Sequence, residues 1–286
     1  MSIFQHYQSR YDEAQEERYS IQEFLAICQQ DRYAYASAAE RLLKAIGEPE
    51  MVDTSTEPRL SRIFSNRVIA RYPAFKEFFG MEEAIEQIVS YLKHASQGLE
   101  EKKQILYLLG PVGGGKSSLA EKLKHLMQKQ PIYCLKGSPV NDHPFCLFDA
   151  DEDGHILEEE YGIPGRYLKT IMSPWAAKRL KEFNGDISQF KVVRKNPSVL
   201  HQIGIAKTEP GDDNNQDISS LVGKVDIRML EDFSQDDPDA YSYSGALCRA
   251  NQGLMEFVEM FKAPIKVLHP LLTATQEGNY NGTEGL

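Results

Sequence analysis

Apolar residues recur at helical spacing through the first fifty positions and again after residue 80. Ser20 and Glu23 stand at the two ends of a capping-box pattern, which predicts that a helix begins there. Asp31 is expected to cap a second helix, whose apolar positions continue until Gly47 stops it. The spacing over residues 82–92 predicts a further amphipathic helix.

Two short apolar runs predict strands on either side of another helix. The first run covers residues 105–109 and the second covers residues 132–135, with a helical pattern over residues 119–127 between them. Strand, helix and strand in this order form the unit of a parallel sheet with helices on its faces. The sequence therefore predicts an α/β fold.

Prolines and small polar residues mark where the regular patterns stop. The stretch 53–58 is rich in Thr, Ser and Pro, and we interpret it as a linker that ends a helical N-terminal segment. Between residues 137 and 245, repeated prolines break the chain into short pieces, with helices predicted over residues 174–183 and 197–206. The polar run 211–217 is expected to form a loop.

Composition narrows the class of protein. The chain of 286 residues is 41% hydrophobic and 26% charged, as in globular proteins, and its formal net charge of −10 argues against indiscriminate binding to nucleic acid or anionic lipid. It has no apolar run of membrane-spanning length and no apolar N-terminal signal, and its four cysteines lack metal-type spacing, so we expect a cytoplasmic protein with reduced thiols. One local group of arginines is either a basic contact surface or a solvated face paired with acidic residues, and we favour the second interpretation. These are Arg59, Arg62, Arg67 and Arg71.

A glycine-rich loop follows the first predicted strand. Residues 110–117 fit G-x-x-x-x-G-K-[ST] at every fixed position and precede a predicted helix, as this pattern requires. Glycines let successive backbone N–H groups turn inward, and the helix N-terminus adds partial positive charge. Lys116 can reach the β- and γ-phosphates, and the Ser117 hydroxyl can ligate Mg²⁺. A glycine-rich turn with a chance lysine is the alternative, but the full pattern predicts a nucleoside triphosphate site. Its residues are Gly110, Pro111, Val112, Gly113, Gly114, Gly115, Lys116, Ser117 and Ser118.

Phosphoryl chemistry at such a loop also needs a carboxylate at the end of a second strand. The apolar run 254–258 is the best candidate for this strand, and Glu259 then stands where a carboxylate would activate the nucleophile. Val258 occupies the preceding position, where an aspartate is usual. Either Mg²⁺ is held through Ser117, water and phosphates, or Glu256 substitutes for the missing acid. A helix with solvated glutamates is the alternative to the strand, because short apolar runs do not separate the two.

An acidic segment, residues 149–160, matches the calcium-binding loop D-x-[DN]-x-[DN]-G-x₅-E. That loop must lie between two helices. Pro139 and Pro144 flank an upstream run that is expected to be extended, and Gly162 and Pro164 are expected to end any downstream helix within one turn. We therefore interpret the segment as a solvated acidic turn.

Several segments outside the loop resemble one family. Together with the loop, they are similar to the PrkA family of AAA+ P-loop ATPases, called serine protein kinases, and the resemblance covers essentially the whole chain. The segments are RLSRIFSNR (59–67), YPAF (72–75), GPVGGGKS (110–117), SPVNDHP (138–144), IMSPW (171–175), AKTEPG (206–211), GALCRANQG (245–253) and LLTATQEG (271–278).

The resemblance implies an AAA+ nucleotide-binding core over residues 71–286, behind a helical N-terminal segment and linker over residues 1–70, with a family-specific insertion at about 137–245. It implies ATP and Mg²⁺ as cofactors, a protein substrate or client, and a homo-oligomeric ring of the full-length protein, without membrane or nucleic-acid partners. Lys116 and Glu259 would then be the catalytic residues. Family members continue well beyond Leu286, so we expect an N-terminal fragment with a truncated core.

Three functions remain open from the sequence. The family name implies ATP-dependent phosphorylation of protein serine or threonine, but the His-Arg-Asp and Asp-Phe-Gly motifs of protein kinases are absent, so Glu259 or Glu256 would have to activate the serine hydroxyl. The second function is an ATP-hydrolysing remodeller or unfoldase, or an ATP-dependent protease, although no protease motif is recognisable. The third is a nucleotide-gated scaffold, in which Val258 leaves binding but poor turnover.

Overall fold

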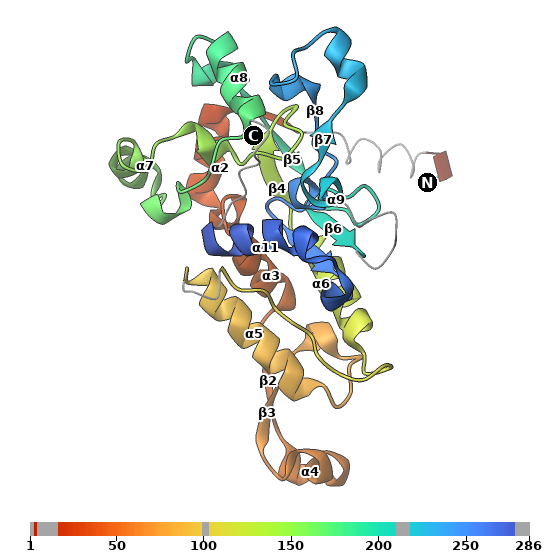
Figure 1. Ribbon diagram of the computed structural model, residues 1–286. Coiled ribbons are helices and arrows are strands. Elements are labelled where there is room, and N and C mark those ends of the chain that lie inside the picture. Colours follow the sequence, from red (N-terminus) through yellow and green to blue (C-terminus); the bar gives the residue numbers. More distant parts are fainter. Residues whose placement is uncertain (1–2, 5–16, 99–102, 210–217, 278–286) are drawn as a thin grey trace. The chain divides into compact units, whose positions relative to one another are not determined.

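The structure, a computed structural model, describes residues 3–4, 17–98, 103–209 and 218–277 (Figure 1). The run 211–217 that was expected to be a loop lies outside these ranges. The chain forms two compact units, each built from two separate stretches of sequence. The first unit contains Met1–Tyr35 and Pro131–Lys195, and the second contains Ala36–Gln130 and Asn196–Leu286.

The first unit is built on a small antiparallel sheet. Its strand order is β1 (Arg18–Ser20), β5 (Lys191–Lys195), β4 (Ile132–Leu135). The strand expected over residues 132–135 therefore forms, but its partner is antiparallel β5 and not a parallel strand over residues 105–109. A four-residue apolar strand carries no information about its partner, which tertiary packing decides.

Helices and turns of the first unit surround an aromatic core. Helix α2 (Ile21–Gln30) begins at the predicted capping box, in which Ser20 accepts from the backbone N–H of Glu23 and Glu23 accepts from that of Ser20. The buried rings of Phe24 and Phe145 meet edge to face in this core, with centroids 5.7 Å apart. Other elements of the unit are η1 (Arg32–Ala34), η5 (Pro144–Leu147), α7 (Gly154–Tyr161), η6 (Gly165–Tyr167), α8 (Pro174–Glu182) and η7 (Ile187–Gln189).

Three helices form the core of the second unit. Helix α3 (Ala38–Ile46) packs against both α5 (Glu82–Ser96) and α6 (Lys116–Met127). This contact places residues 36–70 with the glycine-rich loop, whereas we expected a boundary near residue 70. The prediction that Asp31 caps a long helix was wrong: Asp31 caps only the short η1, and α3 begins at a second capping box formed by Ser37 and Glu40.

The expected linker over residues 53–58 is part of a hairpin. Strand β2 (Glu50–Asp53) pairs antiparallel with β3 (Val68–Arg71), and η2 (Thr54–Thr56) and α4 (Pro58–Phe64) connect them. In Figure 1, α4 lies at the far end of this strand pair. The hydroxyl of the buried Thr54 donates to the carbonyl of Arg67 at 2.7 Å, which fixes the connection to the strand pair and explains why a polar stretch is ordered.

A parallel strand pair completes the second unit. Strand β6 (Ile205–Thr208) pairs with β9 (Leu254–Phe257). The helix predicted over residues 197–206 was wrong, because Ser198 and Ile203 form a β-bridge and the chain turns between them through Gln202, whose φ is 51°. Remaining elements are α9 (Ser219–Val222), β7 (Lys224–Val225), η9 (Ile227–Glu231), η10 (Pro238–Ala240), β8 (Tyr241–Ser242), α10 (Ala246–Arg249), η11 (Met260–Lys262) and α11 (Ile265–Glu277).

The segment 105–109 is extended but forms no strand in the described part of the chain. Its side chains alternate, with Leu106 and Leu108 packed against the helical core while Tyr107 and Leu109 are exposed. The alternation is that of a strand, but a strand also needs a hydrogen-bonded neighbour, and β6 and β9 pair only with each other. None of the helices within the described ranges combines the length and the apolar character needed to cross a membrane.

Candidate functional site

The glycine-rich loop, residues 110–118, joins the extended segment 105–109 to helix α6. Gly113 and Gly115 both have φ near +78°, a conformation that other residues adopt at a steric cost, and Gly115 directly precedes the first helical residue. The backbone N–H of Gly114 donates to the carbonyl oxygen of Pro111 at 3.1 Å, which closes the turn. A Cβ atom on Gly114 would lie 3.0 Å from the same oxygen. The sequence pattern thus produces a tight, glycine-rich turn directly before α6.

Lys116 is folded back over this turn. Its Nζ donates to the carbonyl oxygens of Gly110 at 2.7 Å and Pro111 at 2.6 Å. Val112, Ser117 and Ser118 are exposed, so the outer face of the loop is open to solvent. The ammonium is therefore held at the loop by acceptors that an anionic ligand can replace.

The residues of the loop fit a triphosphate and its magnesium ion. The glycines leave a cradle that a Cβ would fill, the twelve-residue helix α6 contributes the positive end of its dipole, and Lys116 contributes a full charge. The exposed hydroxyl of Ser117 would hold Mg²⁺, which would neutralise phosphate charge. No group of three or more His, Cys, Asp or Glu in the described residues could hold a metal.

Glu256 contributes to packing between the loop helix and the second strand. The predicted run 254–258 forms strand β9, not a helix, and Glu256 on this strand makes an ion pair with Lys124 of α6. Lys124 is only 1% exposed and also pairs with Glu121 at 2.6 Å. Because its carboxylate already has this buried partner, Glu256 is a poor substitute for the acid missing at Val258.

Glu259 lies two residues beyond the end of β9. Its backbone is left-handed, with φ of 52°, and its half-exposed carboxylate pairs with Lys262 at 2.8 Å. The ring of Phe261 meets that of Tyr107 edge to face, with centroids 5.3 Å apart. This contact ties the turn after Glu259 to the segment that leads into the glycine-rich loop, so the two sequence-predicted parts of the site lie on neighbouring elements.

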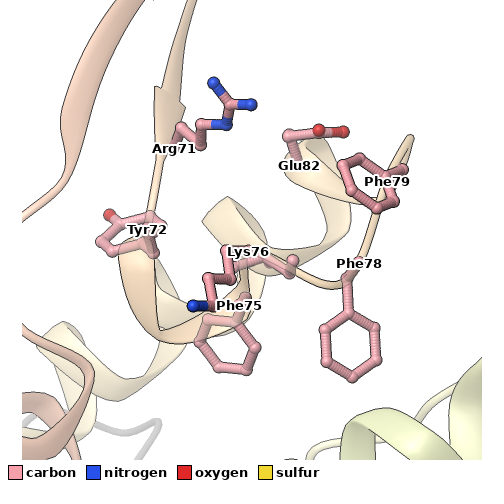
Figure 2. Close-up of a pocket in the computed structure, with 8 residues that line it drawn as sticks. Arg71, Tyr72, Phe75, Lys76, Phe78, Phe79 and Glu82 are labelled. Carbon is pink, nitrogen blue, oxygen red and sulfur yellow. The ribbon is translucent and has the colours of Figure 1, made fainter.

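The second unit also contains a small pocket that the sequence did not predict. Seen in Figure 2, it lies between the end of β3 and the start of α5. Met81, which precedes the lining residue Glu82, lies beside the loop, and its sulfur would be 3.0 Å from a Cβ atom placed on Gly115. The only sequence signal for this pocket is the aromatic cluster before residue 82. Its lining residues are Arg71, Tyr72, Phe75, Lys76, Phe78, Phe79, Glu82 and Ile85.

Comparison with known proteins identifies the family. A profile of the PrkA AAA domain matches residues 19–286. The chain belongs to this family. The AAA domain implies a P-loop NTPase α/β fold that binds nucleotide, in agreement with the mixed helices and strands described above. No solved structure matches the chain.

Curated relatives of this PrkA AAA domain carry different names. Serine/threonine kinase YeaG of Escherichia coli strain K12 is 77% identical over 290 residues, which cover all of this chain and 45% of the relative. ATP-dependent protease PrkA of Bacillus subtilis is 35% identical over 254 residues, 83% of this chain and 40% of the relative. A Lon protease of Malacoplasma penetrans is 28% identical over 93 residues, 32% of this chain and 11% of the relative. The chain thus spans less than half of these relatives and corresponds to an N-terminal part of YeaG.

The acidic segment 149–160 of the PrkA AAA domain is the start of a helix. Asp149 accepts from the backbone N–H groups of Asp151 and Glu152, and Asp153 accepts from that of Asp149. Helix α7 begins at Gly154, inside the segment, and ends at Tyr161 with Gly162 as its C-cap, so the expectation that Gly162 ends a downstream helix within one turn is confirmed. The side chains of two of the three aspartates in the calcium pattern, Asp149 and Asp153, thus accept backbone hydrogen bonds in the turn that precedes α7.

Proposed function

We propose that this PrkA AAA domain binds ATP with Mg²⁺ at the glycine-rich loop and transfers its γ-phosphoryl group. The observation that carries the proposal is the loop geometry, in which glycines in left-handed conformations lead into α6 while the ammonium of Lys116 is held over the turn by carbonyls alone. A triphosphate would replace these carbonyls as the acceptor.

Glu259 is proposed as the general base. In the transfer step the bond between the γ-phosphorus and the β,γ-bridging oxygen breaks, a new bond forms from the γ-phosphorus to the nucleophile oxygen, and ADP leaves. The proton of the nucleophile passes to the Glu259 carboxylate. For this, Glu259 must release Lys262, and its exposed position at the end of β9 leaves room for that change.

We propose a serine or threonine hydroxyl of a protein as the nucleophile. The name of the relative at 77% identity supports this choice. Water is the alternative nucleophile, in which case hydrolysis would drive remodelling or degradation of a client protein. The name of the Bacillus subtilis relative supports that alternative, as does the similarity of one third of the chain to a Lon protease.

One experiment separates the alternatives. The purified chain is incubated with γ-labelled ATP, Mg²⁺ and casein, and label on protein, free phosphate and casein fragments are followed together. Label on serine or threonine supports the kinase, and phosphate release without label supports the hydrolase. Nucleotide binding without either product would support a scaffold.

Lys116→Ala is the decisive variant, and Lys129→Ala is its matched control because Lys129 is an exposed lysine just beyond the same helix. We expect Lys116→Ala to abolish both products and Lys129→Ala to retain them. If Lys116→Ala keeps the activity of the parent chain, the glycine-rich loop is not the site of phosphoryl transfer.

A further inference from the structure

One side of helix α4 is basic and exposed. Arg59 lies three positions before Arg62 and four before Ile63, so these residues share one side of the helix, and all three are exposed, Ile63 by 54%. Arg67 forms an ion pair with Glu83, whereas neither Arg59 nor Arg62 forms one with any residue that the structure describes. We call Arg59, Arg62 and Ile63 the basic surface.

The basic surface is held in place on its hairpin. Phe64, the next residue of α4, is buried, and the buried Thr54 fixes the connection to the strand pair. The whole stretch 58–71 contains four arginines and no acidic residue, although the chain has a formal net charge of −10. Arginine and apolar side chains exposed together on a fixed element are typical of a protein interface, because little conformational entropy is lost on binding.

A second exposed surface has the opposite charge. It lies on η9, in the connection between β7 and β8, where Ile227 is 80% exposed and Met229 and Leu230 are also exposed. Glu231 and Asp232 follow directly, are exposed, and form no ion pair within the described ranges. We call these five residues the acidic surface.

The connection that carries the acidic surface is fixed at its base. The backbone N–H of Asp226 donates to the carbonyl oxygen of Ala240 at 2.8 Å, and the side chain of Asp226 caps η9. Arg228, which lies between the apolar residues, already pairs with Asp226 at 3.0 Å. The acidic surface therefore keeps its negative charge and presents its apolar side chains from a fixed turn.

We propose that the basic surface of one copy of this chain binds the acidic surface of a second copy, head to tail. Charge complementarity selects this occupant, because each surface combines exposed apolar side chains with charges of one sign and the two signs are opposite. Ile63 packs among the apolar residues of η9, and the two arginines pair with the carboxylates beside them. Both surfaces belong to the second unit, and since they differ, the contact is heterologous.

A membrane fits the basic surface less well than a second copy does. Anionic lipids are recognised by clusters of about four to eight basic residues, whereas this surface has two arginines. A membrane or a nucleic acid would also leave the exposed apolar residues of η9 uncovered. A second copy covers both exposed apolar surfaces with one contact.

Sedimentation velocity of the 286-residue chain without nucleotide tests this contact independently of the proposed function. We expect the weight-average sedimentation coefficient to rise between about 1 μM and about 200 μM protein, the range in which a weak protein interface dissociates. The salt concentration is physiological. The Debye length is then about 8 Å, which screens the net charge of the two copies but not the charges in contact.

Charge reversal identifies the two surfaces. The variant Arg59→Glu with Arg62→Glu, and separately the variant Glu231→Lys with Asp232→Lys, should each stay monomeric over this range, because like charges then face each other. An equimolar mixture of the two variants should associate again. In that mixture the unchanged acidic surface of the first variant meets the unchanged basic surface of the second.

Lys93→Glu with Lys129→Glu is the matched control, since it makes the same change in net charge at exposed lysines of the same unit and should associate as the parent does. A parent chain that stays monomeric throughout overturns the proposal, and so does a mixture of the reversed variants that does not associate. Binding of a monomeric parent chain to phosphatidylglycerol vesicles, lost in the arginine variant, would assign the basic surface to a membrane instead. Circular dichroism of each variant checks that the helices remain folded.

Discussion

At the scale of single residues, the proposed mechanism assigns the role of general base to Glu259. We expect Glu259→Gln to lower the rate of phosphoryl transfer about 100-fold, because the amide cannot take the proton of the nucleophile. Nucleotide affinity should stay within about threefold of the parent, since the phosphates are proposed to bind at the glycine-rich loop. The rate of ADP formation and a fluorescent-nucleotide titration measure the two quantities.

Lys262→Ala controls for the ion pair that Glu259 makes in the structure. Removing Lys262 frees the carboxylate and should leave transfer at least as fast as in the parent chain. A Glu259→Gln variant that turns over at the parental rate would exclude Glu259 as the base.

Single residues also differ in how far the sequence alone reveals them. The turn at Gly113 and Gly115 follows from neighbouring residues, and the structure forms it where the pattern predicts. The burial of Glu82 depends instead on segments outside α5, and its Oε2 atom has no hydrogen-bond partner among the described residues. Neither condition is visible in a local pattern, so this residue was missed.

At the scale of elements, one buried ion pair joins the loop helix to the strand that precedes Glu259. Lys124 on α6 pairs with Glu256 on β9 and with Glu121. We expect Lys124→Met to reduce the free energy of unfolding by about 3 kcal/mol, because it leaves the largely buried carboxylate of Glu256 without its cation. The double variant Lys124→Met with Glu256→Leu should recover part of the loss, and urea denaturation measures both.

The pH dependence of this ion pair has a definite sign. Burial lowers the pKa of Lys124, but hydrogen bonds to Glu121 and Glu256 outweigh it and hold the pKa above its ordinary value of 10.5. The stabilisation is therefore fully present below pH 10.5 and is lost as the pH rises through the folded-state pKa. Glu121→Gln, at the 59% exposed partner, should change stability little. A Lys124→Met variant as stable as the parent would mean that the ion pair does not join the two elements.

A second buried carboxylate fixes an element of the first unit. Asp142 accepts from the hydroxyls of Ser138 at 2.8 Å and Ser173 at 2.6 Å, and Ser173 caps α8. Asp142→Ala would leave these donors unpaired in a buried site, so we expect a loss of about 3 kcal/mol in the free energy of unfolding. Asp186→Ala, at the exposed cap of η7, is the control and should unfold at nearly the parental urea concentration. Equal midpoints for the two variants would contradict this role of Asp142.

Helices and strands differed in how well their sequences predicted them. Helices α2 and α8 were predicted because caps and apolar spacing lie within the segment itself. The segment 105–109 and strand β4 have similar apolar runs. The segment 105–109 forms no hydrogen-bonded ladder with the described residues, whereas β4 joins an antiparallel sheet. Strand pairing depends on residues far along the chain, and no local pattern specifies the partner.

At the scale of the whole molecule, the two units interleave along the sequence. The chain leaves the first unit after Tyr35, builds the loop and its helices in the second unit, and returns at Pro131. Such an arrangement depends on contacts between distant segments, and the local patterns that suggested a boundary near residue 70 contain no information about those contacts. The proposed nucleotide site lies wholly within the second unit. Nucleotide binding should therefore stabilise the second unit more than the first, and this asymmetry can be tested.

Hydrogen exchange followed by mass spectrometry tests that asymmetry. A nonhydrolysable ATP analogue at 100 times its dissociation constant stabilises the bound unit by about 2.7 kcal/mol, which slows exchange of amides that open only by unfolding of that unit about 100-fold. We expect this protection in peptides from α6 and β9 of the second unit, and little in β4 and β5 of the first. The Lys116→Ala variant should lose it everywhere. Equal protection of β4 and β5 would mean that the two units unfold as one body, and protection confined to the first unit would place the ligand away from the glycine-rich loop.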